Sequence, residues 1–105
     1  MSSRNSSDAS RRQVQAFRAL SNPARYEILR SVVCSGEWEP CREIIARLGV
    51  TPPAVSGHLR VLEAADLVQL ERRGAQLFVA LAPTDLAYQM AAVIRLAVGA
   101  SPSSS

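Results

Sequence analysis

The stretch TPPAVSGHLRVLEAADLV, residues 51–68, holds the side chains whose types and spacing best support chemistry. Its apolar residues recur at helical spacing and form one inward stripe, which leaves Ser56, Gly57 and Arg60 outside. A glycine inside a helix costs about 1 kcal/mol relative to alanine. A sequence that keeps Gly57 on an exposed face therefore suggests that something large approaches the backbone there. The planar guanidinium of Arg60 can donate two hydrogen bonds side by side, a geometry that suits phosphates and guanine edges.

The same stretch argues against an enzyme. Ser56 and His58 are two residues apart on a helix, so their side chains point in different directions and cannot form a nucleophile–base pair. The rest of the chain shows no phosphate-binding loop, no paired acids and no cluster of metal ligands. For His58, the only histidine, packing with one hydrogen bond is favoured over metal ligation, and a phosphate contact stays open.

The two cysteines leave three readings open. Cys34 and Cys41 are too few for a disulfide framework, so in a reducing cytosol they are ordinary thiols. Alternatively, the short loop SGEWEP lets them meet as a redox switch, with the start of a helix favouring the Cys41 thiolate. A metal site needs ligands beyond these two, either from a second copy or from Glu37, Glu39 or the N-terminus.

Length and charge set the broad class. At 105 residues the chain is expected to form one domain with a modest core. Its net charge is +3, and all 12 basic residues are arginine, which permits nucleic-acid binding without demanding it. The sequence has no apolar run long enough to span a bilayer, and its first ten residues lack the apolar segment of a signal peptide. A cytoplasmic protein without a membrane partner is expected.

The elements that must position the outer face of the 51–65 helix can be read from periodicity and from proline and glycine signals. Mainly helical structure with one β-hairpin is expected, in the order α-α-α-α-β-β-α. Gly74 supplies the hairpin turn, and Arg72 and Arg73 lie at or near its tip. The expected segments are a flexible tail over 1–10, a domain over 11–99 with helices from 11, 22, 40, 51 and 84 and a hairpin over 67–81, and a flexible tail over 100–105.

The last helix is so apolar that a second copy of the chain is expected to cover it, giving a homodimer. The only charge after Asp85 is Arg95. The expected interface draws on the last helix and the first. Its predicted residues are Val14, Phe17, Leu86, Met90, Ile94 and Val98.

With these elements in order, the chain resembles the ArsR/SmtB family of small dimeric bacterial transcriptional regulators. FRALSNPARYEILRSV is similar to the family's ALxxPxRxxIL, and ARLGVTPPAVSGHLRVLEAADLVQLERRGAQLFVAL to LGxSxxxVSxHLxxLxxAGLVxxxxxGxxxxYxL. The match covers roughly residues 13 to 99. Asp66 replaces the usual glycine after the helix and tolerates the same left-handed cap, and Phe78 stands near the usual wing aromatic.

This resemblance implies a winged helix-turn-helix whose 51–65 helix enters the major groove of double-stranded DNA at a near-palindromic site. Arg72 and Arg73 would then touch the flanking backbone or minor groove. The DNA-binding residues so implied are Thr51, Pro53, Ser56, Gly57, His58, Arg60, Arg72 and Arg73.

The resemblance also implies a repressor that an inducer releases, either a metal ion or a redox signal acting on Cys34 and Cys41. The family's familiar metal ligands on the last helix are absent here, so no cofactor is required, although a regulatory transition metal stays open. The rival hypothesis is a winged helix that binds protein instead of DNA. It would predict an apolar or acidic outer face on the 51–65 helix, unlike the one found.

Overall fold

The computed structural model describes residues 2–99, with side chains from 8 to 97. It contains a mainly helical domain with a small sheet, and the expected winged helix-turn-helix is confirmed. The elements are α1 (Ser2–Leu20), α2 (Pro23–Ser35), β1 (Glu39–Pro40), α3 (Cys41–Leu48), α4 (Pro52–Ala64), β2 (Val68–Arg73), β3 (Gln76–Leu81) and α5 (Asp85–Gly99). Within the described residues, no helix is long and apolar enough to cross a membrane.

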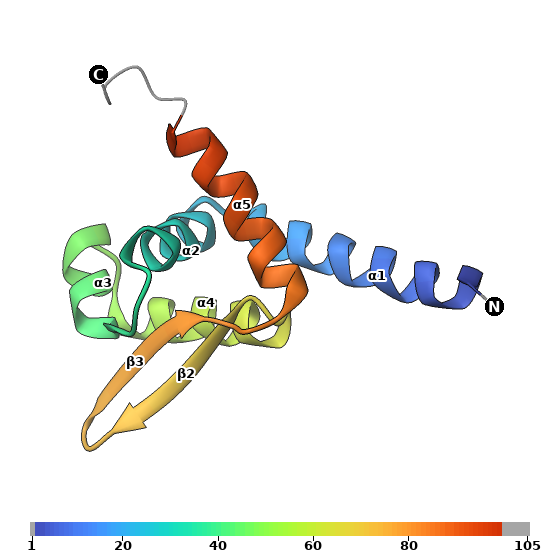
Figure 1. Cartoon of the computed structure of the whole chain (residues 1–105). Helices are drawn as coiled ribbons and strands as arrows, with labels where there is room; N and C mark the ends of the chain where they lie inside the picture. The colour runs from blue at the N-terminus through green and yellow to red at the C-terminus, as the bar shows by residue number, and fades with distance from the viewer. Residues whose placement is uncertain (1, 100–105) are drawn as a thin grey trace.

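The elements are arranged around α2 (Figure 1). Helices α3 and α4 form the helix-turn-helix beside it, and the β2–β3 hairpin extends from the same side as α4. Helix α5 crosses on the side away from the hairpin, and α1 projects outward as an arm. The face of α4 that turns away from α2 is therefore free of covering elements.

A single core holds these elements together. Side chains from all five helices and the sheet meet in it, and the largest that are fully buried are Ile28, Leu29, Ile44, Leu59, Leu62, Leu67, Val32, Val55 and Val79. Their spacing along α2 and α4 is the i, i+3, i+4 pattern of a helix with one buried stripe. This burial fixes which side of α4 is left for a partner.

The hairpin turns where the sequence predicted, and the sheet gains one strand. Gly74 has φ +63°, which a left-handed turn position requires. Strand β3 pairs with β2 on one side and with the two-residue strand β1 on the other, with Pro40 opposite Phe78. The third helix was predicted to begin at Pro40. The structure starts it at Cys41, because Glu39 and Pro40 pair with the wing.

The first helix begins earlier than predicted. Its backbone is helical from Ser2, where a tail over residues 1–10 was expected. Residues 8–15 are all exposed, and Ala16 is the first buried residue among those whose side chains are described, so residues 8–15 are held by helical hydrogen bonds rather than by packing. The mobility of the two ends stays a prediction, and residues 100–105 lie outside the described residues.

Within the protomer, the last helix buries the face that was predicted to form the dimer interface. Met90 and Ile94 are only 7% and 3% exposed and belong to the core of this protomer. Leu86 packs against the same core. The side chain of Val98 lies outside the described residues. The prediction that Met90 and Ile94 form the interface is corrected, because α5 turns this stripe toward α2.

Candidate nucleic-acid interface

Helix α4 begins as its sequence predicted. Thr51 is the N-cap, and its Oγ1 accepts a hydrogen bond from the amide of Ala54 at 3.4 Å. The amide of the third helical residue takes this role because Pro53 has no N–H to donate. The two prolines occupy the first turn, where amide hydrogens lack intrahelical partners. The helix therefore presents a well-defined N-terminal end at the surface.

The outer face of α4 is as bare as its sequence indicates. Pro53, Ser56, Gly57 and Arg60 are all exposed. A Cβ added at Gly57 would meet no atom within 4 Å, so packing inside the protomer does not require glycine there. Among the described residues, Arg60 takes part in no ion pair. The face thus offers a free guanidinium and an open backbone to a partner.

Thr51 and His58 lie at the edges of this face. Thr51 is exposed, but its hydroxyl oxygen already accepts the capping bond. His58 is half-buried, and helical geometry turns it about 160° away from Arg60. Of the predicted DNA-binding residues on α4, His58 is therefore the one turned most toward the body of the protein.

The wing does not present both of its arginines equally. Arg73 is ion-paired with Glu71 on the same strand, with Nη2 2.8 Å and Nε 3.0 Å from Oε1. Its guanidinium carbon lies 4.4 Å from the ring centroid of Phe78 and 5.3 Å from that of Trp38. Two aromatic rings and a carboxylate thus contact the Arg73 guanidinium, which was predicted to contact DNA. Arg73 is a structural residue of the wing in this conformation, and its predicted direct contact is not supported.

Arg72 points the other way. Side chains alternate along β2, so Arg72 shares the face of Leu70 rather than that of Arg73. It is exposed and has no ion pair among the described residues. Of the two wing arginines, Arg72 is the one left free for phosphate.

An ion pair between the buried Glu39 and the half-exposed Arg47 supports the start of α3, and nothing in the sequence pattern predicted it. Glu39 is 7% exposed, and its Oε2 lies 2.5 Å from Nη2 of Arg47. The hydroxyl of Ser31 donates to Oε1 of Glu39 at 3.2 Å and also contacts Arg47. This cluster ties α2, β1 and α3 together. No periodic signal marks it, because its three members come from separate elements.

The two cysteines lie in different surroundings. Cys34 is exposed and lines an open cavity of about 490 Å³, which also contains Arg30 and Arg47. Cys41 is buried and lines a different cavity of about 240 Å³ near Gln76. Burial, and next the charge of Glu39, raise the pKa of the Cys41 thiol above its ordinary value, while Arg72 lowers it. The expectation that a helix start favours the Cys41 thiolate is therefore corrected.

The placement of the His, Cys, Asp and Glu side chains decides whether the described residues could bind a metal ion. No group of three or more His, Cys, Asp and Glu side chains within the described part of the chain is placed to hold a metal ion. A metal shared between copies, or one using residues outside that part, stays a prediction.

Comparison with known proteins finds a helix-turn-helix family match and solved structures with a similar fold. Residues 20–71 match the model of a helix-turn-helix domain family. HlyU from Vibrio cholerae is 25% identical over 84% of this chain and 94% of its own, with a TM-score of 0.73. No curated protein sequence matches significantly.

Two further solved structures share the fold. The transcriptional repressor BigR from Xylella fastidiosa is 19% identical over 93% of this chain and 96% of its own, with a TM-score of 0.74. The homodimeric winged helix-turn-helix DNA-binding domain of Mb0332 from Mycobacterium bovis, described as a possible ArsR-family transcriptional regulator, is 19% identical over 89% and 83%, with a TM-score of 0.72. These structures share the winged-helix fold that the resemblance to the ArsR family implied, and they support that resemblance.

Proposed function

We propose that this chain, a winged helix-turn-helix protein of the ArsR type, binds a specific double-stranded DNA site as a homodimer and represses transcription by occluding the promoter. The observation that carries the proposal is the outer face of α4, where small side chains surround an unpaired Arg60. Small residues let a helix lie deep in the major groove, and one arginine can bind O6 and N7 of guanine together. Ser56 adds a hydroxyl that suits either a base edge or a phosphate.

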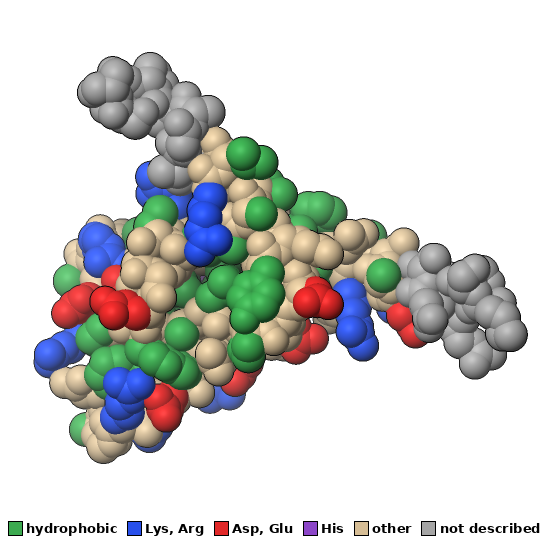
Figure 2. Space-filling view, viewed as in Figure 1, with side chains coloured by type: hydrophobic (Ala, Val, Ile, Leu, Met, Phe, Trp, Pro, Cys, Tyr) green, Lys and Arg blue, Asp and Glu red, His purple; other side chains and the backbone are tan. Residues whose placement is uncertain are grey.

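Exposed apolar side chains on α1 and α5 support the dimer. Phe17 is 59% exposed, and Leu96 is 74% exposed. Hydrophobic side chains gather along α5 and near the point where it crosses α1 (Figure 2). The residues available to a second copy are Val14, Phe17, Tyr88, Val93 and Leu96. Burying such side chains drives association, and a two-fold dimer would place two α4 helices about one DNA turn apart.

A two-fold arrangement of reading helices implies a near-palindromic operator, and a regulator of this kind would act in the cytoplasm. The inducer is proposed as one of two classes, a transition metal held between copies or an oxidant acting on the thiols. In the thiol class, the exposed Cys34 is the residue that an oxidant reaches first. Replacement of Cys34 by serine would then abolish any effect of an oxidant on DNA affinity, and an unchanged oxidant effect would rule the thiol class out.

The test is fluorescence anisotropy with purified, reduced protein on duplexes selected from a random pool, repeated across a salt series. We expect tight binding that weakens steeply with salt and is lost in Arg60→Ala. Light scattering on the free protein reports the dimer. If no duplex is enriched and the wild-type chain binds DNA weakly at every salt concentration, the proposal fails. The protein-binding winged helix then takes its place.

A further inference from the structure

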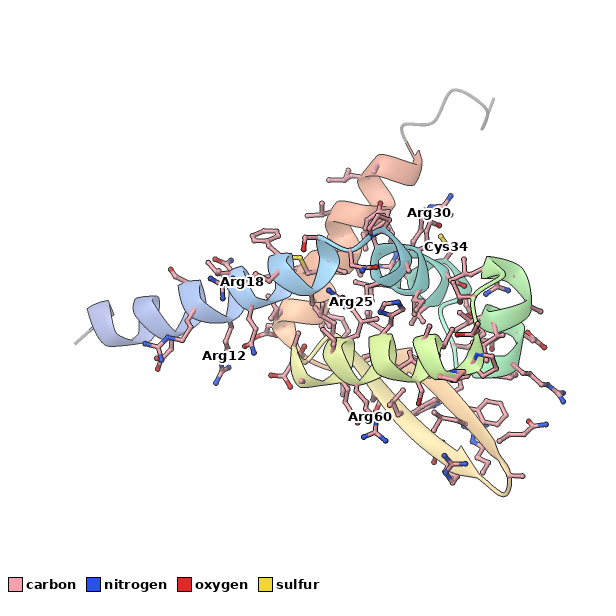
Figure 3. All side chains as sticks on the ribbon, turned by 180° about the vertical axis from the view of Figure 1, so that it is seen from behind. Arg12, Arg18, Arg25, Arg30, Cys34 and Arg60 are labelled. Carbon is pink, nitrogen blue, oxygen red and sulfur yellow. The ribbon has the colours of Figure 1, made fainter. Side chains whose placement is uncertain are left out.

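Three arginines outside α4 and the wing lie on the same side of the molecule as Arg60 (Figure 3). Arg12 and Arg18 lie on α1 and are exposed, and Arg25 lies in the first turn of α2 and is half-buried. Figure 3 shows them along the side of the molecule that leads from α1 to α4 and Arg60. These three residues, here called the flanking arginines, have no part in the DNA contacts assigned above.

Two of the flanking arginines, Arg18 and Arg25, border α4 at its C-terminal end, and Arg12 lies further along α1. A surface groove of about 300 Å³ is lined by Gln15 and Arg18 of α1, Arg25 of α2, and Val61 and Ala64 of α4. Ala64 is four residues after Arg60 and therefore lies on the same face of α4. The groove thus joins the face proposed to read bases with the basic side of α1, with only small or apolar side chains between them.

The charges around this groove are left unbalanced. The ion pairs among the described residues involve Arg30, Arg47 and Arg73, and none involves a flanking arginine. The only carboxylate on α1 is Asp8, and it forms no ion pair with Arg12 in the described structure. On α4, Glu63 lies about 160° around the helix from Val61 and so points away from the groove. Arginines that no ion pair neutralises in the described structure are suited to a polyanion.

The flanking arginines also have a suitable spacing and anchorage. Arg12 and Arg18 are six residues apart, which places them about 9 Å apart along the helix axis and about 120° apart around it, so each guanidinium would meet a different phosphate. The Nε of Arg25 donates to the carbonyl of Ala19 at 2.6 Å, which holds its guanidinium at the groove. Its terminal nitrogen groups take part in no ion pair among the described residues.

We propose that Arg12, Arg18 and Arg25 bind backbone phosphates of the operator beside the C-terminal end of α4, and so extend the DNA contact beyond the recognition helix and wing. The inference rests on the proposed function. Phosphate contacts supply affinity without reading sequence. The flanking arginines therefore set how tightly the protein holds any duplex, while Arg60 sets which duplex it prefers.

The experiment compares Arg12→Ala/Arg18→Ala with the wild type and with Arg95→Ala. Arg95 is an exposed arginine on α5 without an ion pair among the described residues, so it is the matched control. Arg25 is left unchanged because its hydrogen bond to Ala19 supports the join between α1 and α2. Anisotropy is measured on a selected operator duplex and on a 40-base-pair duplex of mixed sequence, from low to moderate salt. Circular dichroism and light scattering verify the fold and the dimer.

For the double variant we expect affinity to fall at least about tenfold on both duplexes, with the ratio between them unchanged. The slope of log K against log salt should become shallower by about 3–4 units, because four phosphate contacts are lost in a dimer. Arg95→Ala should behave as the wild type. A double variant with wild-type affinity and slope overturns the inference while leaving the proposed function intact, provided that Arg60→Ala still loses binding. A wild-type chain that binds neither duplex overturns both.

Discussion

Arg60 on the outer face of α4 and Arg73 on the wing were both predicted to contact DNA, but their surroundings in the structure are opposite. Arg60 stands among small side chains and has no ion pair among the described residues. Arg73 is held by Glu71 and by the rings of Trp38 and Phe78. The comparison shows that position in a motif does not make an arginine available, because its neighbours decide whether its donors are already occupied.

The largest effect that separates the two regions is expected from Arg60→Ala. A bidentate arginine–guanine contact is worth about 1–3 kcal/mol, and a dimer loses two of them. Affinity for the selected operator should therefore fall by about 30-fold or more, while the free energy of unfolding changes by less than about 0.5 kcal/mol. Anisotropy and chemical denaturation measure the two quantities. A variant that unfolds more easily but binds DNA as before would reverse the comparison.

Arg73→Ala should show the opposite profile. The two ring contacts and the half-exposed ion pair together suggest a loss of about 1–2 kcal/mol in the free energy of unfolding. DNA affinity should fall less than in Arg72→Ala, the matched variant on the neighbouring wing residue. Denaturation and anisotropy on both variants check this. Equal stability of the two variants, with Arg73→Ala binding DNA worse, would show that Arg73 leaves its rings to contact DNA.

Gly57→Ala tests whether DNA approaches the backbone of α4 as closely as its bare outer face suggests. The added methyl group meets open space, and alanine favours a helix over glycine by about 1 kcal/mol, so the protein should become more stable by up to that amount. The same methyl group should obstruct a close-lying duplex and weaken operator binding several-fold. Thermal melts and anisotropy on one preparation report both. Unchanged DNA binding in the stabilised variant would mean that the duplex does not approach this backbone closely.

The smallest expected effect concerns Cys41, on the packed side of the molecule. Because its pKa is raised in the folded state, the thiol favours folding below its unfolded value of 9.0, and that contribution is lost as pH rises through the folded pKa. Unfolding free energy should therefore decline above about pH 9 in the wild type, and less so in Cys41→Ala. Alkylation followed by mass spectrometry should label the exposed Cys34 well before Cys41. Similar labelling rates would show that the wing opens readily.

Much of the fold could be predicted because its signals are local. The capping of α4 by Thr51, the turn at Gly74 and the left-handed backbone of Asp66, with φ +63°, each depend on a few consecutive residues. The bare face of α4 follows from helical periodicity alone. The strand at Glu39 and Pro40 could not be predicted in this way, because two residues carry no period and their partner lies near Phe78, far along the chain.

By itself, then, the sequence determined the order of elements, the ends of α4, and the residues of α4 that face outward, since hydrogen bonds and steric preferences within one turn of chain decide these. Only the tertiary structure decided that Met90 and Ile94 serve the protomer's own core, that Arg73 is held in the wing, and that Arg18 and Arg25 border α4. These depend on contacts between residues distant in the chain. Packing between distant parts of the chain decides which neighbours contact a side chain, and no local sequence pattern predicts it.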